Sequence, residues 1–237
     1  MNDATIRLCW CALGDFDDRF EGFREELPAE ERDRADRFRV EASRRRFVLA
    51  RTLLRRELAV IVGVEPGALD FGVGDRGKPH LTNPVPGEPL LFNLSHSGEI
   101  VVLAIAGVDV GADVESLRPV PKAEKLAHRF FSPAERMTVL SFDDESRDRA
   151  FLRIWTQKEA YLKATGLGVG MPLREVEAEP DPNAPPRLIA VGGDREEAAR
   201  WQLHEVEIPG AVCTVASLGS VSGVEVVRRT AGDLDSS

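Results

Sequence analysis

Cysteine is scarce in this chain, and long apolar runs are absent. Its 237 residues include only three cysteines, Cys9, Cys11 and Cys213, which are too few and too unevenly spaced for a disulfide framework or a zinc site. The longest apolar runs, such as residues 100–106, are far too short to cross a bilayer, and the N-terminus lacks the basic and apolar regions of a signal peptide. We therefore expect buried, inert thiols, a reducing cytoplasm and no association with a membrane.

The chain also lacks net positive charge. Its 40 acidic residues outnumber 31 Lys and Arg, and the formal charge of −9 argues against broad binding of nucleic acid. Positive charge is concentrated locally, since ten arginines fall between Arg32 and Arg56, including the triplet at 44–46. Such a basic face suits a small phosphorylated ligand or an acidic partner. The alternative is a solvated helix laced with ion pairs, because Asp and Glu are interspersed among these arginines.

Lysine is the rarer cation. The chain has only five: Lys78, Lys122, Lys125, Lys158 and Lys163. An ammonium is a compact, flexible charge that a guanidinium does not replace, so a lysine retained in an arginine-rich chain indicates a position that needs such a group.

The spacing of apolar residues predicts an α+β fold with two similar lobes. Each half offers helix first and antiparallel strands afterwards; residues 28–62 are typical of one helix ending at Gly63, and Gly107 is expected to turn a hairpin between two apolar strands. Strands are predicted at 5–13, 99–107, 108–114, 201–208 and 211–218. We expect two pseudo-symmetric lobes that share a cleft, each a small antiparallel sheet packed with helices. The first lobe would span residues 1–112 and the second residues 113–229, and residues 230–237 would form a disordered tail.

The most informative segment is 151–163. As a helix it places Phe151, Trp155, Glu159 and Lys163 at four-residue steps, so that an acid and a base continue a stripe that begins with two large aromatic residues. The alternative is an ordinary Glu-to-Lys surface pair.

A second acidic site lies upstream, at Asp113 and Glu115. Residues i and i+2 of a strand share a face, so both carboxylates point the same way while Val114 points to the core. Paired carboxylates suit Mg²⁺, which takes the rest of its ligands from water and substrate phosphates. Glu159 could complete the site. The alternative is an exposed strand end.

Three further motifs are each a weak indication of function when taken singly. Ser132, Pro133 and Glu135 fit a helix N-terminus with a capping box, which accounts for Glu135 without a catalytic role. The Ser95-His96-Ser97 sequence suggests a nucleophile, but it leads into a strand and lacks the glycine pattern of a nucleophile elbow; a turn that binds phosphate suits it as well. Lys78, in a Gly-Lys-Pro turn, is typical of an anchored cation.

Together these motifs resemble one family, the 4′-phosphopantetheinyl transferases. The ordered signatures are Val-Gly-Ala-Asp-Val-Glu at 110–115, Phe-Ser-Pro-Ala-Glu at 131–135 and Trp-Thr-Gln-Lys-Glu-Ala-Tyr-Leu-Lys at 155–163. Gly-Lys-Pro at 77–79 and Phe-Asn-Leu-Ser-His-Ser at 92–97 match upstream motifs of the larger, surfactin-synthetase-activating (Sfp-like) branch. One departure is Ala112, where the family usually has Ile or Val.

The resemblance implies an activity and roles for the residues. The family transfers the phosphopantetheine arm of coenzyme A to a serine hydroxyl of an apo carrier protein and releases adenosine 3′,5′-bisphosphate. By that similarity Asp113, Glu115 and Glu159 would hold Mg²⁺, and Glu159 is also the candidate base. The resemblance further implies that Lys163 and His96 bind the pyrophosphate and that Ser95 lies beside the nucleotide. The residues that it places near the 3′-phosphate are Lys78, Pro79, Arg46 and, more weakly, Arg51.

The resemblance further implies a monomer that acts on carriers of fatty-acid, polyketide or non-ribosomal-peptide synthesis. Two other classes remain open. A module that binds coenzyme A without turnover would not need the carboxylates, and a metal-dependent phosphohydrolase would normally use more His or Asp ligands than this chain offers.

Overall fold

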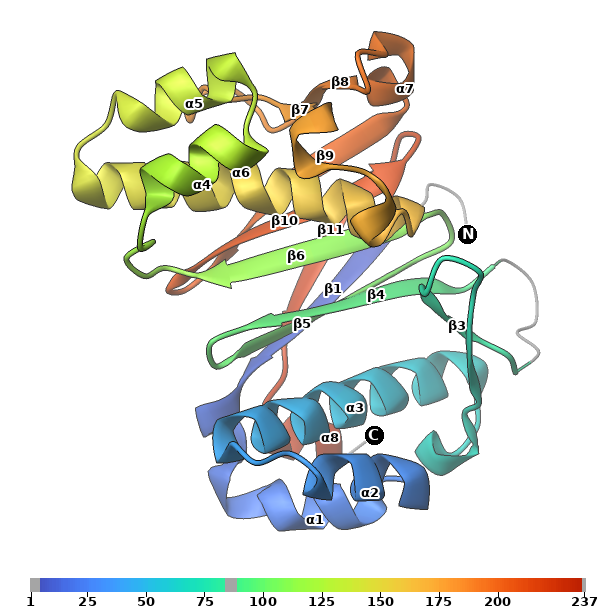
Figure 1. Cartoon of the computed structure of the whole chain (residues 1–237). Helices are drawn as coiled ribbons and strands as arrows, with labels where there is room; N and C mark the ends of the chain where they lie inside the picture. Colours follow the sequence, from blue (N-terminus) through green and yellow to red (C-terminus); the bar gives the residue numbers. More distant parts are fainter. Residues whose placement is uncertain (1–4, 84–88, 236–237) are drawn as a thin grey trace.

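Two β-sheets stacked face to face form the centre of the molecule, and helices cover their outer faces (Figure 1). The structure is a computed structural model and describes residues 5–83 and 89–235. The first sheet has the order β11-β1-β5-β4 and the second the order β6-β10-β9. The strands span Thr5–Ala12 (β1), Leu91–Ser97 (β4), Ile100–Ala106 (β5), Val110–Ser116 (β6), Trp201–Ile208 (β9), Ala211–Leu218 (β10) and Gly223–Arg228 (β11). The predicted α+β fold is confirmed.

Alternation along the strands builds two separate apolar layers. Residues of β1 and β5 on one face, such as Leu8 and Val102, meet Val114 of β6 and Val215 of β10 between the sheets. Residues on the opposite face of the first sheet, such as Leu103, pack against helices instead. The two halves of the chain therefore share one core, rather than meeting only at a cleft.

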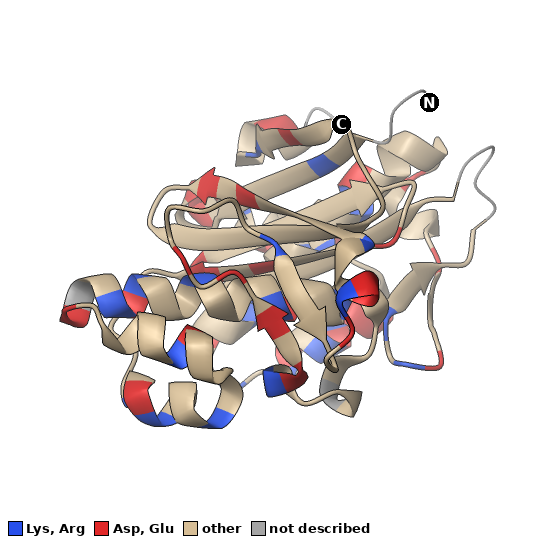
Figure 2. Cartoon of the chain, turned by 90° about the horizontal axis from the view of Figure 1, so that it is seen from above, with Lys and Arg blue, Asp and Glu red and all other residues tan. Residues whose placement is uncertain are grey.

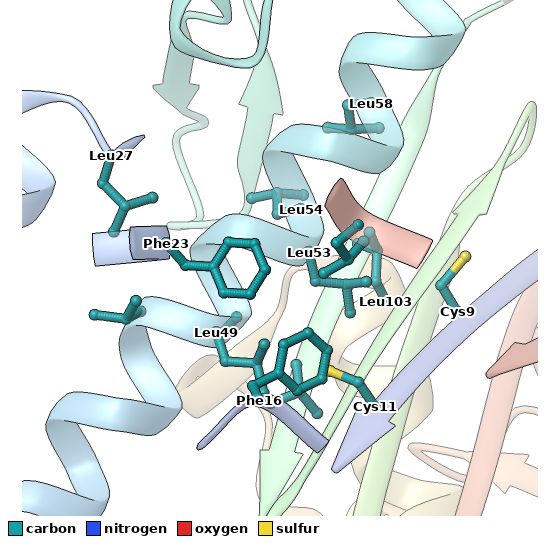
Figure 3. Close-up of a cluster of buried hydrophobic side chains, with 14 of the residues drawn as sticks. Cys9, Cys11, Phe16, Phe23, Leu27, Leu49, Leu53, Leu54, Leu58 and Leu103 are labelled. Atoms are coloured by element: carbon teal, nitrogen blue, oxygen red, sulfur yellow. The ribbon is translucent and has the colours of Figure 1, made fainter. Parts of the chain in front are cut away.

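Three helices cover the outer face of the first sheet: α1 (Phe20–Glu26), α2 (Ala29–Asp36) and α3 (Glu41–Val62). Figure 3 shows Leu49, Leu53 and Leu58 of α3 pointing toward Cys9, Cys11 and Leu103 of the sheet, with Phe16 and Phe23 closing the cluster. Gly63, at φ 77°, ends α3 in the left-handed region that glycine adopts without strain. All three cysteines are buried and unpaired, as expected.

The predicted single helix over 28–62 is wrong in one respect. The chain leaves helical geometry between Asp36 and Glu41, and Val40 is extended at φ −106°, ψ 118°. A continuous helix of this length would be about 50 Å long, more than the sheet can cover. Instead α2 lies along α3, where Glu31 accepts hydrogen bonds from Arg51 and Arg55.

The hairpin expected at Gly107 does not form. β5 pairs with β1 and β4, whereas β6 pairs with β10 in the other sheet. β5 is buried along its whole length and already has a neighbour on each side, so the chain must cross to the second sheet after Ala106. The hairpin that does form joins β4 to β5 at Gly98.

The second half places its long helix α6 (Asp144–Thr165) on the outer face of the second sheet, with α4 (Ala123–Phe130) and α5 (Pro133–Leu140) beside it (Figure 1). The sequence analysis did not predict α4. It did predict the β9–β10 hairpin, which turns at Pro209-Gly210. The smaller elements are β2 (Phe71–Val73), β3 (Pro79–Leu81), β7 (Val176–Ala178), β8 (Leu188–Val191), α7 (Arg195–Ala199), α8 (Ala231–Asp235) and 3₁₀ turns at Leu13–Arg19, Pro66–Ala68, Gly168–Gly170 and Leu173–Glu175.

The C-terminal segment returns to the first half. β11 pairs in parallel with β1, and Arg229 donates to Glu57 of α3 with Nε–Oε1 at 2.6 Å. Leu234 of α8 is fully buried in the first core. A disordered tail is therefore wrong for 230–235, because this segment completes the core; residues 236–237 lie outside the described part. The halves also divide differently from the predicted boundary at 112/113, which would cut β6.

Within residues 5–83 and 89–235, no helix combines the length and the apolar character needed to cross a membrane.

Candidate active site

Asp113, Lys163 and Ser95 converge from three elements at the junction of the two halves. Lys163 Nζ on α6 lies 2.5 Å from Asp113 Oδ1 on β6 and 2.8 Å from Ser95 Oγ on β4. The Ser95 hydroxyl in turn donates to Asp113 Oδ1 at 3.2 Å. Asp113 and Ser95 are each only 5% exposed. A buried carboxylate, a buried hydroxyl and a half-buried ammonium, far apart in the sequence, thus form one polar cluster.

The approach of α6 to β6 depends on Gly111. A Cβ atom at this position would lie 2.2 Å from the carbonyl oxygen of Ala160 and 2.3 Å from the amide nitrogen of Ala164, both in α6. Gly111 therefore lets the helix backbone contact the strand directly. Alternation then sends Asp113 and Glu115 to the same, α6-facing side, while Val114 joins the core between the sheets. The predicted shared face of the two carboxylates is confirmed.

Aromatic packing fixes the other end of the α6 stripe. The rings of Phe151 and Trp155 stack with centroids 5.8 Å apart, and Phe151 stacks on Phe131 at 4.8 Å. Glu159 and Lys163 follow Trp155 by about one and two turns on the same side of the helix. The alternative of an i, i+4 surface pair is not borne out, because Lys163 forms its ion pair with Asp113 rather than Glu159.

Like charges accumulate around Asp113. Burial raises the pKa of Asp113 to about 7; Lys163 opposes the rise, and the negative charges of Glu159 and Glu115 add to it. Burial also raises the pKa of Glu159, again against Lys163 and with Glu115. Three carboxylates therefore lie within electrostatic range of one another. Lys163 offsets the charge of Asp113 and Glu159 only in part, and Arg118 forms an ion pair with Glu115.

The donor set fits a hard divalent cation such as Mg²⁺. Asp113 Oδ2 is buried and receives no hydrogen bond from the described residues, and an unpartnered carboxylate oxygen in a cluster of acids is the ligand that such an ion prefers. Within the described ranges, however, no three Asp, Glu, His or Cys side chains already stand close enough together to enclose a metal. The three-carboxylate ligand set stays a prediction.

Arg46 and His96 lie on the opposite side of β4, toward α3. Partial desolvation, and after it the positive charges of Arg46 and Lys163, lower the pKa of His96 below its ordinary value. Arg44 and Arg45 are committed to ion pairs with Glu21 and Asp17. Arg46 Nε, by contrast, is buried and has no hydrogen-bond partner among the described residues. A cation and an imidazole are therefore left available to an anion here.

Only part of the ten arginines between Arg32 and Arg56 have acidic partners among the described residues. Those at 44, 45, 51, 55 and 56 form ion pairs with acidic side chains, so the alternative of a helix laced with ion pairs explains half of them. Figure 2 views the molecule from the side of α4, α5 and α6, and both signs of charge are interspersed along these helices as well. Arg51, the weaker candidate for the 3′-phosphate, donates to Glu31 and lies over the Phe71 ring.

Lys78 lies in the β2–β3 turn, as predicted, and contacts backbone. Its Nζ donates to Val110 O at 3.1 Å and to Ala164 O at 2.7 Å, which ties the turn to the start of β6 and the end of α6. Burial lowers the pKa of Lys78, and the charge of Asp109 opposes this. Lys78 and the exposed Pro79 line a pocket of about 180 Å³ together with Phe92.

Glu135 has a structural role. Its Oε2 accepts from the Ser132 amide at 2.7 Å, which completes the predicted capping box, and from Lys158 Nζ at 2.6 Å. Its Oε1 accepts from the amide of Ala178 at 2.7 Å. Glu135 is 1% exposed, so both carboxylate oxygens are committed inside the protein.

Sequence reasoning missed the polar side chains of β4 other than Ser95 and His96. The 95–97 motif lies in a strand rather than a turn. Asn93 and Ser97, to which no role was assigned, hydrogen-bond to β6 (Asn93 Oδ1 to the Ala112 amide at 2.9 Å, Ser97 Oγ to Glu115 Oε2 at 2.7 Å). The alternation Asn-x-Ser-x-Ser was the only available signal.

Comparison with known proteins identifies the family of the chain. A family model described as 4′-phosphopantetheinyl transferase superfamily matches residues 109–216, and another described as 4′-phosphopantetheinyl transferase, N-terminal matches 16–107. The two models meet where β5 ends and β6 begins. HetI of Nostoc sp., a 4′-phosphopantetheinyl transferase, is 41% identical over 80% of this chain and 77% of its own length.

The chain therefore belongs to the 4′-phosphopantetheinyl transferase superfamily. Another member, Sfp of Bacillus subtilis, is 29% identical over 66% of each chain. Among solved structures, a holo-(acyl-carrier-protein) synthase of Bacillus anthracis aligns over 48% of this chain and 97% of its own, with 23% identity and a TM-score of 0.39, too low to compare the sites.

Proposed function

We propose that the chain transfers the 4′-phosphopantetheine arm of coenzyme A to a serine hydroxyl of an apo carrier protein, at the junction of its two halves. In this reaction the serine oxygen bonds to the phosphorus next to the pantetheine arm, and the bond from that phosphorus to the bridging oxygen breaks. Adenosine 3′,5′-bisphosphate leaves. The observation that carries the proposal is the cluster of Asp113, Lys163 and Ser95 in a member of this superfamily.

The cations at the junction would bind the coenzyme A phosphates. Arg46, with its unpartnered Nε, and Lys78 are assigned to the 3′-phosphate side, with Pro79 beside them and Arg51 as a weaker candidate. His96 and Lys163 are assigned to the pyrophosphate. Ser95 is assigned to the nucleotide side, although its hydroxyl is already engaged with Asp113, Lys163 and the Val114 amide.

The carboxylates Asp113, Glu115 and Glu159 are the proposed Mg²⁺ ligands. When bound, Mg²⁺ would offset the negative charge of the pyrophosphate and of the bridging oxygen. Glu159, directly or through an oriented water, accepts the proton of the serine hydroxyl.

The second substrate is a carrier protein or carrier domain of polyketide, non-ribosomal-peptide or fatty-acid synthesis. Such carriers are acidic, so that arginines left exposed would assist encounter. We further propose that the enzyme acts as a monomer, because its two halves already share one core, and that it acts in the cytoplasm, which suits three unpaired cysteines. Size-exclusion chromatography with light scattering tests the oligomeric state.

Intact-mass spectrometry tests the reaction. The enzyme is incubated with coenzyme A, Mg²⁺ and a panel of apo carrier proteins, and the carrier should gain the mass of the arm. Asp113→Ala and Glu159→Ala should each abolish the gain while the far-ultraviolet circular dichroism stays unchanged. Glu225→Ala, which removes an exposed carboxylate on β11, is the matched control. Full activity of either site variant would refute the metal assignment.

The same assay separates the two other classes. A coenzyme A-binding module would bind the ligand without changing any carrier. A metal-dependent phosphohydrolase would release adenosine 3′,5′-bisphosphate from coenzyme A when no carrier is added. The convergence of Asp113 with Glu115 and Glu159 in electrostatic range favours the transferase over a module that needs no carboxylates.

A further inference from the structure

Side chains of β4 take the place of a partner strand along one edge of β6. On its other edge β6 pairs with β10. Toward β4 no backbone ladder forms, and the two strands belong to different sheets. Instead the amides of Ala112, Val114 and Ser116 donate to side chains of β4 (Asn93 Oδ1 at 2.9 Å, Ser95 Oγ at 3.4 Å and Ser97 Oγ at 3.2 Å). Every second residue of β4 thus bridges the two halves of the chain.

The two serines of this series repeat one arrangement. Ser95 accepts from the amide of residue 114 and donates to the carboxylate of Asp113. Ser97 accepts from the amide of residue 116 and donates to the carboxylate of Glu115, with Oγ–Oε2 at 2.7 Å. A serine hydroxyl has a single proton to donate, and the β6 amide in each case occupies an acceptor position. The proton is thereby directed to the carboxylate of the preceding residue.

Each carboxylate is consequently held by one oxygen. Asp113 Oδ1 is held by Ser95 and Lys163, whereas Oδ2 has no partner among the described residues. Glu115 Oε2 is held by Ser97 and by Arg118, whose side chain is 51% exposed. No described residue donates to Glu115 Oε1. Arg118 is exposed and follows Glu115 by only three residues, just after β6 ends. Ser97 is therefore the better anchored of the two partners of Glu115.

We propose that Ser97 is a positioning residue for phosphopantetheine transfer, which orients Glu115 from the opposite half of the molecule so that its second oxygen remains available beside Asp113. The proposal rests on the proposed function, since it concerns the carboxylates assigned there to the cation. Groups that orient metal-binding side chains matter because loss of such a hydrogen bond lets the ligand rotate away.

The first experiment measures cation binding without turnover. Mn²⁺, which takes the same oxygen ligands as Mg²⁺, is titrated into the enzyme with coenzyme A and no carrier, and the electron paramagnetic resonance signal of free Mn²⁺ reports binding. Ser97→Ala should weaken Mn²⁺ binding by about 10- to 100-fold, the usual effect of removing such a hydrogen bond. Ser97→Thr keeps the hydroxyl and should retain most of the affinity.

The second experiment measures transfer with the same variants by intact mass. At a fixed Mg²⁺ concentration, Ser97→Ala should lower kcat by about 10- to 100-fold, and Ser97→Thr should restore most of it. Ser116→Ala is the matched control. It removes a hydroxyl that donates to Ser97 O at 2.9 Å and does not contact Glu115, so it should lower the melting temperature like Ser97→Ala while Mn²⁺ binding and kcat stay at wild-type values.

Several results would overturn the proposal. Wild-type Mn²⁺ affinity in Ser97→Ala would do so, as would equal losses in Ser97→Thr and Ser97→Ala, or a loss in Ser116→Ala as large as in Ser97→Ala. If Ser97→Ala does not fold, Ser97→Cys substitutes for it, because a thiol is a weak donor; wild-type affinity there refutes the role. If the wild-type enzyme modifies no carrier, the proposed function fails, whereas an active wild type with an unaffected Ser97→Ala refutes the role of Ser97 alone.

Discussion

Replacing Gly111 with alanine tests whether the contact of β6 with α6 sets the geometry of the site. The added Cβ would lie 2.2 Å from Ala160 O and 2.3 Å from Ala164 N, whereas ordinary contacts begin at 3.4 Å. Both neighbours are backbone atoms, so no side-chain rotation relieves the clash. The helix must therefore retreat by about 1.2 Å, the difference between 2.2 and 3.4 Å.

A retreat of this size has two measurable consequences. Lys163 and Glu159 move with α6 away from Asp113, and a 1 Å misplacement of reacting groups can slow a reaction by about 100-fold. Strain from an added methyl group in a packed core costs about 1–3 kcal/mol of unfolding free energy. We expect Gly111→Ala to show both effects, the first as a lower rate of mass gain of an apo carrier and the second as a lower urea midpoint.

The matched control is Gly67→Ala, where an added Cβ would meet nothing within 4 Å. This variant should keep the wild-type rate and midpoint. The reasoning is refuted if Gly111→Ala also keeps both, since α6 would then not need the close contact. If Gly111→Ala loses stability but transfers at the wild-type rate, the contact is purely structural.

Three further predictions follow from buried polar groups. Glu135→Ala should lower the unfolding free energy in urea by about 3–5 kcal/mol, because it leaves the buried Lys158 without its counter-ion, while the folded fraction still transfers the arm; an unchanged urea midpoint would contradict this. For Glu31, burial alone would raise the pKa, but hydrogen bonds from Arg55 and Arg51 bring it below the ordinary 4.5. The wild type should therefore be more stable than Glu31→Gln by a constant amount above pH 4.5, and this difference should shrink as the pH falls through the pKa of Glu31 in the folded protein. A difference in unfolding free energy that grows in acid would contradict the lowered pKa. Burial raises the pKa of Cys9 to about 12 and raises those of Cys11 and Cys213 as well, so a thiol reagent at neutral pH should label none of the three until denaturant is added; rapid labelling of the native protein would disprove their burial.

Local patterns predicted the parts of the site that depend on local geometry. The four-residue spacing of 151–163 and the alternation of 113–115 hold in the structure because helix and strand periods decide which side chains share a face. The capping box could be predicted from the sequence because its two residues, Ser132 and Glu135, are only three positions apart.

The pairing of strands that are distant in the sequence could not be predicted from local patterns. β5 and β6 are both apolar, and nothing within either strand says whether they pair with each other or with strands of two different sheets. The same limit applies to Asn93 and Ser97. Each accepts from a backbone amide of β6 that any sequence would provide, and the carboxylate to which Ser97 donates, Glu115, lies on that same distant strand. The position of β11 depends on a free edge of β1, which no local signal reveals.

The scarcity of lysine was informative. Lys78, Lys158 and Lys163 each donate to at least two oxygens, from carbonyls, carboxylates or a hydroxyl. An ammonium donates three protons from one atom, whereas a guanidinium donates in a fixed planar fork. In this arginine-rich chain, three of the five lysines thus lie at junctions between elements.

Strand β11 has a consequence for how the polypeptide assembles on the ribosome. Its ladder partners on β1 are 218 residues away in the chain, as for Thr5 and Gly223. Until that segment emerges, β1 presents an open edge to solvent, and open edges recruit strands of other molecules. Nascent chains that stall after the first half should therefore depend on chaperones, and separate expression of residues 5–106 should yield aggregates, since this fragment also lacks the second sheet that covers its inner apolar face.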